Sequence, residues 1–268
     1  MKIKMITIAP EVEAVLHQAI LDDNKLILQG QLDRLMYTKV MKILEQIGFK
    51  WNKKEKCHIG EGDSADKLRE ALGSGKVVNE KQTYQFFETQ EAEADNMVER
   101  AEILPNYRVL EPSAGRGAII KAIYRKLGDN APFRVHAVEL DPHNVEVLKD
   151  MVHVIVYAHD FMEHPTTGYG YKYDRILMNP PFNGGQDVEH VRHAYEMLDN
   201  GGKIIAIMST GWLTKSDKKS ATFRRWFDDL SELGYAEVVE KIKSGAFKNS
   251  GTMVETLMVS IEKPPSSF

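Results

Sequence analysis

The sequence predicts a doubly wound α/β domain over residues 81–268, preceded by a small α+β module over residues 1–80. From residue 91 onward, short apolar runs alternate with amphipathic segments, which is typical of a parallel sheet covered by helices. A glycine-bearing turn follows the first run and polar side chains end the next three, as at the ligand-binding edge of such a sheet. The last two apolar runs, 236–242 and 252–261, predict an antiparallel final hairpin.

Composition places the chain among ordinary globular proteins, with 268 residues, 43% of them hydrophobic and 28% charged. The net charge of −4 excludes a globally basic nucleic-acid binder but leaves local basic patches open. Cys57 is the only cysteine, so no disulfide forms within one chain and we expect a cytoplasmic location. The sequence has no signal-peptide pattern and no run of about 20 apolar residues, so we expect no membrane partner.

The amino-terminal module is expected to contain helices and a hairpin. The expected elements are helices over 12–20 and 36–47, a hairpin of 49–51 with 56–59, and a short helix over 63–72. Gly48 is placed to end the second helix. The middle of the module is locally basic and rich in rings: Arg34, Lys39, Lys42, Lys50, Lys53, Lys54 and Lys56 alternate with Tyr37, Phe49 and Trp51. This mixture indicates either a nucleic-acid groove or a solvated surface over aromatic core residues.

The core begins with a helix over 91–103, for which Thr89 is the expected N-cap. Strands are expected over 107–111, 135–139, 152–157, 175–178 and 203–208, with a helix over 188–198. Gly115 and Gly117 follow the first strand and permit a tight turn that approaches a ligand closely. Ile120 stands where a dinucleotide fingerprint has its third glycine, which weakens a nicotinamide interpretation.

Polar residues end the second and third core strands. Glu139 lies at the position where doubly wound folds hold ribose hydroxyls, and Leu140 beside it is suited to lie against an adenine face. Asp160 is placed to accept a hydrogen bond from an adenine amino group, with Phe161 packed on the ring. The alternative for each acid is an ordinary helix cap.

The fourth core strand ends in Asn179, Pro180, Pro181 and Phe182. The prolines stiffen the turn, and the Asn179 side-chain oxygen and Pro180 carbonyl can accept both protons of an amino group while Phe182 stacks on the ring that carries it. This arrangement suits the exocyclic amine of adenine, which is a poor nucleophile because its lone pair is delocalised. The alternative is a turn that only ends a strand.

Two further clusters lie outside these strand ends. Residues 214–225 are basic and lie among Trp212, Phe223 and Trp226, which indicates either a mobile loop over a substrate mouth or a solvated charge run. His190 and His193 share a helix face without a third ligand, and Cys57 with His58 lacks zinc spacing, so no metal site is expected.

Residues 86–262 resemble the class I, Rossmann-like methyltransferases that use S-adenosylmethionine, and within them the amino-methyltransferases that act on adenine in DNA. By this resemblance the cofactor-binding residues are Thr89, Glu111, Pro112, Ala114, Gly115, Gly117, Glu139, Leu140, Asp160, Phe161 and Asn179. The catalytic motif is Asn179, Pro180, Pro181 and Phe182, and the base-stacking residues are Phe182 and Phe247. The chain departs from the family at Gln90, where proline is usual, and at Phe182, where tyrosine is common.

The resemblance implies transfer of a methyl group from S-adenosylmethionine to N6 of adenine, with DNA as the partner and no metal. One alternative keeps the chemistry but uses RNA bases or protein glutamine as the substrate. A second alternative is a non-catalytic nucleic-acid-binding module with the same fold.

Overall fold

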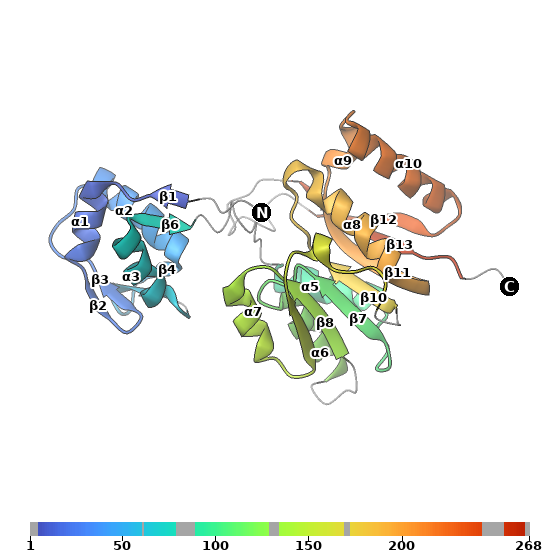
Figure 1. Cartoon of the computed structure of the whole chain (residues 1–268), viewed down its shortest axis with the longest axis horizontal. Helices are drawn as coiled ribbons and strands as arrows, with labels where there is room; N and C mark the ends of the chain where they lie inside the picture. The colour runs from blue at the N-terminus through green and yellow to red at the C-terminus, as the bar shows by residue number, and fades with distance from the viewer. Residues whose placement is uncertain are drawn as a thin grey trace. The chain divides into compact units, whose positions relative to one another are not determined.

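The computed structural model describes residues 5–60, 62–78, 89–128, 134–168, 172–242 and 255–265. The chain divides into two compact units, Met1–Gln85 and Phe86–Phe268, coloured blue to teal and green to red in Figure 1. In these described ranges no helix has both the length and the apolar character needed to cross a membrane.

The described part of the first unit has α+β architecture. A four-stranded antiparallel sheet has the order β2 (Ile20–Asp22), β3 (Lys25–Ile27), β5 (Cys57–Gly60) and β4 (Phe49–Asn52), and β1 (Met5–Thr7) pairs with β6 (Lys76–Val78). The helices are α1 (Pro10–His17), α2 (Arg34–Ile47) and α3 (Ser64–Ser74). Val40, Leu44 and Phe49 are fully buried in the core between α2 and the sheet.

Helix α2 is fixed at both ends by its sequence. The Asp33 carboxylate accepts a hydrogen bond from the Met36 N–H at 2.8 Å, and Gly48 ends the helix with a left-handed φ of 97°. The predicted role of Gly48 is therefore confirmed, as is the hairpin of β4 and β5. The prediction that the first helix runs through residue 20 is wrong. Helix α1 ends at His17, and Ile20 pairs with Ile27 across a turn in which Asp23 has a φ of 51°.

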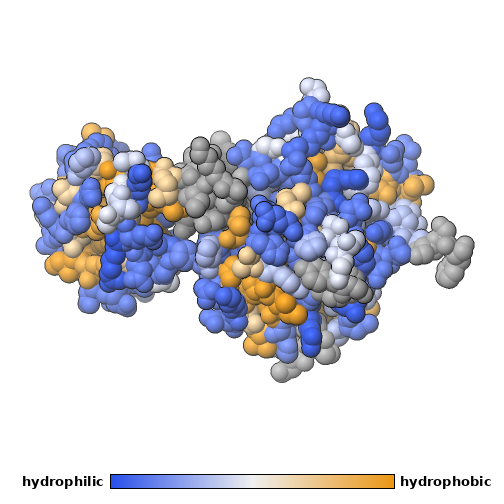
Figure 2. All heavy atoms as spheres, in the orientation of Figure 1, coloured by the Kyte–Doolittle hydropathy of each residue, from blue (hydrophilic) through white to orange (hydrophobic). Residues whose placement is uncertain are grey.

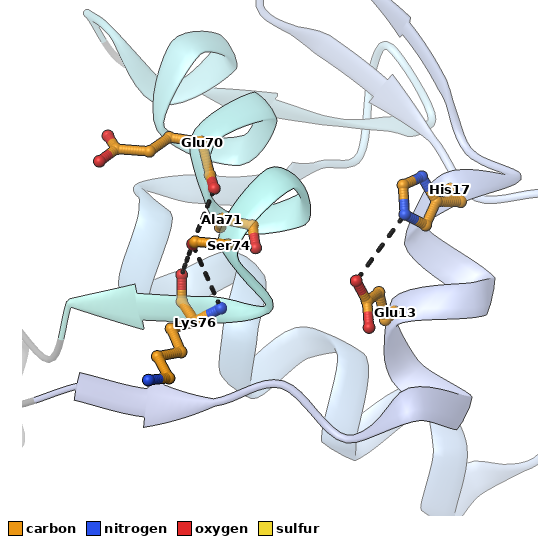
Figure 3. A network of polar contacts seen from close by, with 6 residues as sticks. All are labelled: Glu13, His17, Glu70, Ala71, Ser74 and Lys76. Atoms are coloured by element: carbon orange, nitrogen blue, oxygen red, sulfur yellow. Dashed lines mark hydrogen bonds and ion pairs between the residues drawn. The ribbon is translucent and has the colours of Figure 1, made fainter.

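Helix α3 ends in a polar network that ties it to β6, which Figure 3 shows. The Ser74 hydroxyl donates to the Glu70 carbonyl at 2.8 Å, and the Lys76 N–H donates to the Ser74 oxygen at 3.4 Å. The Ser74 hydroxyl therefore links the last turn of the helix to the first residue of the strand. Gly75 then reverses the chain with a φ of 65°.

In the described part of the second unit, seven strands form one sheet. In sheet order they are β12 (Ala236–Ile242), β13 (Thr256–Glu262), β11 (Leu198–Ser209), β10 (Tyr173–Met178), β7 (Arg108–Pro112), β8 (Arg134–Glu139) and β9 (Val154–Ala158). Strands β11, β10, β7, β8 and β9 are mutually parallel, and β13 runs antiparallel to both β11 and β12. The predicted fold class, including the antiparallel final pair, is confirmed.

Helices cover both faces of this sheet (Figure 1). They are α5 (Glu91–Ala101), α6 (Ala118–Leu127), α7 (Pro142–Lys149), α8 (Gln186–Met197), α9 (Gly211–Thr214) and α10 (Lys218–Glu232), with 3-10 turns η1 (Phe161–Glu163) and η2 (Asn183–Gly185). Val109 packs with residues of α5, α6 and α7, whereas Leu110 packs with residues of α8 and α10. This alternation shows that side chains of β7 point to opposite faces, so the unit has a core on each side of its sheet.

Several predicted details of the second unit are wrong. Of the two interpretations of residues 214–225, the mobile loop is wrong, because most of the segment belongs to α10, which starts at Lys218 after the Asp217 carboxylate accepts the Ser220 N–H. Trp212, which precedes the segment, is 3% exposed in the core. The N-cap of α5 is Gln90 and not Thr89. The helix expected over 188–198 stops at Met197, and β11 begins at Leu198.

Some large apolar side chains are exposed in each unit. Figure 2 shows orange surface over β2 and β3, where Ile20 and Ile27 are 53% and 45% exposed. A second orange area lies near α7 and β9, where Val152 and Ile155 are exposed. Exposed apolar side chains are stronger signs of a binding site when they border a pocket, and Ile27 borders one.

Candidate active site

Four strand ends meet at one edge of the sheet in the second unit. Strand β7 pairs in parallel with β8 on one side and β10 on the other, and β8 pairs in parallel with β9. Neighbouring strands lie about 4.8 Å apart, so the residues that follow these four strands line an edge roughly 15 Å wide. Ligands of open α/β sheets bind at such carboxyl ends, where the strand order reverses.

The turn after β7 is built from left-handed backbone. Ser113, Gly115 and Gly117 have φ values of 70, 55 and 72°. The N–H groups of Ser113 and Ala114 donate to the Val138 carbonyl at 2.8 and 3.0 Å, which ties the turn to β8. Helix α6 begins directly after the turn, so its unpaired N-terminal N–H groups lie near the same edge.

Gly117 is favoured by its backbone conformation as well as by ligand approach. Its φ of 72° strains any L side chain. A Cβ at this position would also lie 2.6 Å from the Met151 Cε and 2.8 Å from its Sδ, so the end of that flexible side chain would have to shift. The glycine spacing is evident in the sequence, but its partner at residue 151 is not.

Glu139, the last residue of β8, fastens the glycine turn with its carboxylate. Its Oε2 accepts the Gly115 N–H at 2.6 Å, and its Oε1 accepts the N–H groups of Leu140 and Asp141 at 2.9 and 2.7 Å. Burial raises the pKa of Glu139, and these N–H donors oppose that rise. A carboxylate has about four lone-pair positions, so Glu139 keeps acceptor capacity toward the edge.

Glu111 lies in β7 beneath the turn and is 3% exposed. Its Oε2 has no hydrogen-bond partner among the described residues. Burial raises the pKa of Glu111 well above its ordinary value, and the negative charge of Glu139 adds to the rise. A buried carboxyl without full hydrogen bonding is costly, so this group fits a site that is completed by a cationic or hydrogen-bond-donating ligand.

Asn179 directly follows β10 and is held by Thr89. The Asn179 Nδ2 donates to the Thr89 Oγ1 at 3.1 Å, across 90 positions of sequence. This bond turns the amide nitrogen toward Thr89, which is itself 8% exposed, and sets the amide oxygen on the opposite side. Pro180 is buried and Pro181 half-buried, so the turn after the amide is rigid.

Phe182 is 8% exposed and packs in the apolar cluster that contains Ala94, Ala114 and Leu177. In this conformation its ring supports the turn, and a stacked base would need it to become more accessible. Phe247, the other expected stacking residue, lies outside the described residues.

Asp160 and Phe161 follow β9, the outermost strand of this edge. The Asp160 carboxylate accepts a hydrogen bond from the Met162 N–H at 3.0 Å and so caps η1. The alternative interpretation of Asp160, a helix cap, therefore accounts for part of its hydrogen-bond acceptor capacity. Phe161 is 3% exposed and faces the α8 side of the sheet. Leu140 is half-buried at the end of β8.

A cluster of histidines surrounds Phe161, although the sequence pattern gives no sign that these residues meet. His159 Nε2 and His164 Nδ1 are 2.9 Å apart, and His190 and His193 contact the Phe161 ring at 5.4 and 5.0 Å between centroids. Burial lowers the pKa values of His164 and His190 to about 4. In the described ranges no three His, Cys, Asp or Glu side chains converge closely enough to hold a metal ion.

Two positioning contacts were also missed by sequence reasoning. One is the bond between Thr89 and Asn179, because its partners are far apart in sequence. The other is Asp187, fully buried at the start of α8, whose Oδ2 accepts both the N–H and the hydroxyl of Ser209 at 2.9 and 2.7 Å. Burial raises the pKa of Asp187, and the Ser209 bonds oppose the rise. The one available signal was an acid directly before the helix expected over 188–198.

Comparison with solved structures finds the same architecture in DNA-modification subunits. The chain is similar to the type I restriction-modification system methyltransferase subunit from Streptococcus thermophilus, with a TM-score of 0.56, 18% identity and coverage of 75% of this chain and 50% of that one. It is also similar to a modification subunit assigned to a type I restriction enzyme from Vibrio vulnificus, with a TM-score of 0.54, 16% identity and coverage of 89% and 56%. The chain therefore spans about half the length of these proteins.

No protein-family model matches the sequence, and the search of curated proteins found no match. At these identities the structural likeness shows the fold alone, an architecture that the chain shares with these two subunits.

Proposed function

We propose that this protein transfers a methyl group from S-adenosylmethionine to the exocyclic N6 of adenine in DNA. The observation that carries the proposal is the position of the Asn179 amide. It follows β10, immediately beside the glycine turn of β7, with Glu139 one strand further along the same edge. Two strand spacings separate Asn179 from Glu139, roughly 10 Å, which leaves room for one elongated ligand between an amide and a carboxylate.

The described residues fit S-adenosylmethionine at this edge. We propose that Glu139 accepts ribose hydroxyls and that Asp160 and Leu140, which follow β9 and β8, contact the adenine ring. The Oε2 of Glu111, buried without a hydrogen-bond partner in the described chain, suits a cationic group. When bound, the cofactor supplies a methyl group on a positively charged sulfur, ready for direct transfer.

Asn179 and Pro180 are proposed to activate the substrate amine. The Asn179 amide oxygen and the Pro180 carbonyl accept hydrogen bonds from the two N–H groups of the amine, so the nitrogen lone pair becomes available as the nitrogen turns pyramidal. The nitrogen forms its bond to the methyl carbon as the bond from that carbon to sulfur breaks, and it then loses one proton to solvent. Preorganised acceptors of this kind stabilise a transition state without reorganisation. Thr89 contributes as a positioning residue, because its hydroxyl fixes the direction of the amide.

The base is proposed to leave the duplex before it reacts, since an enzyme cannot reach an exocyclic amine inside the stack. Phe182 and Phe247 are proposed to pack against the extruded ring. For Phe182 this requires a side-chain shift, because the ring is buried in the cluster described above.

The choice of DNA rests on the fold likeness to the two modification subunits. The same amide chemistry serves RNA bases and protein glutamine, and these are the competing substrates. A non-catalytic nucleic-acid-binding module is the other alternative, and it gives no reason for an Asn179 amide that is tied to Thr89.

The test is labelled-methyl transfer from S-adenosylmethionine to DNA, RNA and whole-protein extract, followed by nucleoside and amino-acid analysis. The proposal expects N6-methyladenine in DNA. Label in RNA or in glutamine alone contradicts the DNA assignment and keeps the methyl-transfer chemistry. The absence of label in all three substrates, with normal cofactor binding, favours the non-catalytic alternative.

A further inference from the structure

The first unit carries a small pocket of about 220 Å³ on its four-stranded sheet. His58 and Leu26 contribute to it from the sheet, and Tyr37 and Trp51 contribute aromatic side chains. Pockets for drug-sized ligands typically measure ~300–1,000 Å³. This pocket therefore matches one planar ring system and excludes a whole nucleotide.

Strand register explains why the pocket exists. Trp51 and Leu26 both pair directly with His58, so these three side chains share one face of the sheet. Phe49 lies on the same face and is fully buried against α2 residues. Trp51, two residues further along β4, is 49% exposed. Helix α2 therefore covers the Phe49 end of this face and leaves the Trp51 end open beside Tyr37.

His58 is the unusual residue of the pocket. It is 2% exposed, and neither ring nitrogen makes a hydrogen bond among the described residues. The Trp51 ring approaches it at 5.0 Å with an interplanar angle of 60°. Burial lowers the pKa of His58, although the nearby Leu26 carbonyl partly opposes this without completing a bond. The ring is neutral at pH 7 and so offers one donor and one acceptor.

The surroundings of the pocket are cationic. Lys56 lines it, and exposed Lys53 and Lys54 lie in the same β4–β5 turn. Lys25 is neutralised by Glu55 at 2.8 Å, which leaves the charge of the turn to these other lysines. Exposed rings beside cations that track a phosphate backbone are the usual features of single-strand binding surfaces.

We propose that this pocket binds one base of a single-stranded nucleic acid. The base stacks on Trp51, beside Tyr37, and presents its polar edge to His58. Lysines of the β4–β5 turn contact the flanking phosphates. The site lies in the first unit and does not depend on methyl transfer by the second.

The test compares two oligonucleotides of equal length, a fluorescein-labelled thymidine 12-mer and the same backbone with abasic positions. Full-length protein and its Trp51→Ala variant are titrated with each, and fluorescence anisotropy is measured. One base–aromatic stack is worth ~1–3 kcal/mol, so we expect Trp51→Ala to weaken binding of the thymidine strand by roughly 5- to 150-fold. Binding of the abasic strand, which keeps every phosphate, should be unchanged.

Two variants control for damage to the fold. Trp51→Phe keeps an aromatic face and should retain most of the affinity. Leu35→Ala removes an apolar side chain that is 69% exposed and does not line the pocket, so it should bind like wild type. Thymidine lacks the adenine amine, so the result is independent of the proposed reaction.

Equal reductions in affinity for both strands would mean that Trp51 acts through the fold and would overturn the proposal. Unchanged binding of both strands would also overturn it and would favour another occupant, such as a peptide segment. Methyl transfer measured on the same variants reports separately on the second unit.

Discussion

Replacing His190 by leucine should reduce the amount by which the free energy of unfolding of the second unit falls in acid. His190 is 5% exposed on α8, and its Nδ1 has no hydrogen-bond partner in the described part of the chain. Burial lowers its pKa to about 4, and nearby His193 acts in the same direction, while Asp160 and Glu189 oppose the shift. The ring is therefore neutral in the folded protein at pH 5, where it is charged in the unfolded chain.

The size of the effect follows from proton linkage. Above pH 6.5 the ring is neutral in both states, and the contribution of His190 to stability is fully present. As the pH falls below 6.5 the unfolded chain binds the proton first, so stability decreases until the pH passes the folded pKa of about 4. With about 1.4 kcal/mol per pKa unit, the decrease is about 2 kcal/mol at pH 5 and about 3 kcal/mol below pH 4.

The assay is urea unfolding at pH 7.5 and 5.0, followed by the fluorescence of Trp212 and Trp226 in a Trp51→Phe background, so that only the second unit is observed. The stability of His190→Leu relative to wild type should rise by about 2 kcal/mol between the two pH values. Contributions from carboxyls with raised pKa values, such as Asp187, are common to both proteins and cancel.

The matched control is Val147→Ala. Val147 is 40% exposed on α7, and neither valine nor alanine titrates, so the stability difference of this variant from wild type should not depend on pH. If the stabilities of His190→Leu and wild type fell in parallel, within about 0.5 kcal/mol, the assignment of a buried neutral His190 would be refuted.

Three further predictions concern charged groups. Glu139→Gln should weaken S-adenosylmethionine binding by roughly 10- to 150-fold, as expected for charge-assisted hydrogen bonds worth ~1.5–3 kcal/mol; calorimetric titration at wild-type affinity would remove Glu139 from the site. Glu111→Gln should match wild-type stability near pH 4 and exceed it at pH 8. The reason is that the raised pKa of Glu111 gives the wild type stability that is present below about pH 4.5 and lost as the pH rises through the folded pKa. Thermal unfolding at both pH values measures this, and a difference between the two proteins that is the same at both pH values would contradict it. Replacing Lys50, Lys53, Lys54 and Lys56 together by alanine should flatten the salt dependence of duplex binding by about 0.9 in log–log slope for each phosphate that these lysines neutralise; an unchanged slope would exclude them from the phosphate backbone.

The core strands and their polar ends could be predicted because local signals carry them. The glycine turn after β7, Glu139 after β8 and Asn179 after β10 each follow an apolar run, and parallel pairing brings such ends to one edge. The same holds for Gly48, whose left-handed φ ends α2. In each case the signal lies within a few residues of the end of a strand or helix and does not depend on contacts with distant segments.

Contacts between distant segments could not be predicted in the same way. The Thr89 hydroxyl meets the Asn179 amide across 90 positions, and Met151 lies beside Gly117 although 34 positions separate them. For the basic segment 214–225 the sequence left a mobile loop and a solvated charge run open, and the structure shows that Asp217 caps a helix whose Phe223 and Phe227 enter the core. His58 was considered in the sequence only as a possible metal ligand and was rejected in that role. The register of β4 and β5 pairs it directly with Trp51.

The proposed mechanism depends on Asn179 acting in the reaction, and one paired measurement tests it. Cofactor affinity by calorimetry and the single-turnover rate of methyl transfer to DNA should be determined for wild type, Asn179→Ala and the neighbouring control Asn183→Ala. We predict that Asn179→Ala binds S-adenosylmethionine within about twofold of wild type and transfers the methyl group roughly 100- to 1,000-fold more slowly, as for removal of one preorganised acceptor from a transition state. A single-turnover rate within a factor of about two of wild type would contradict the mechanism.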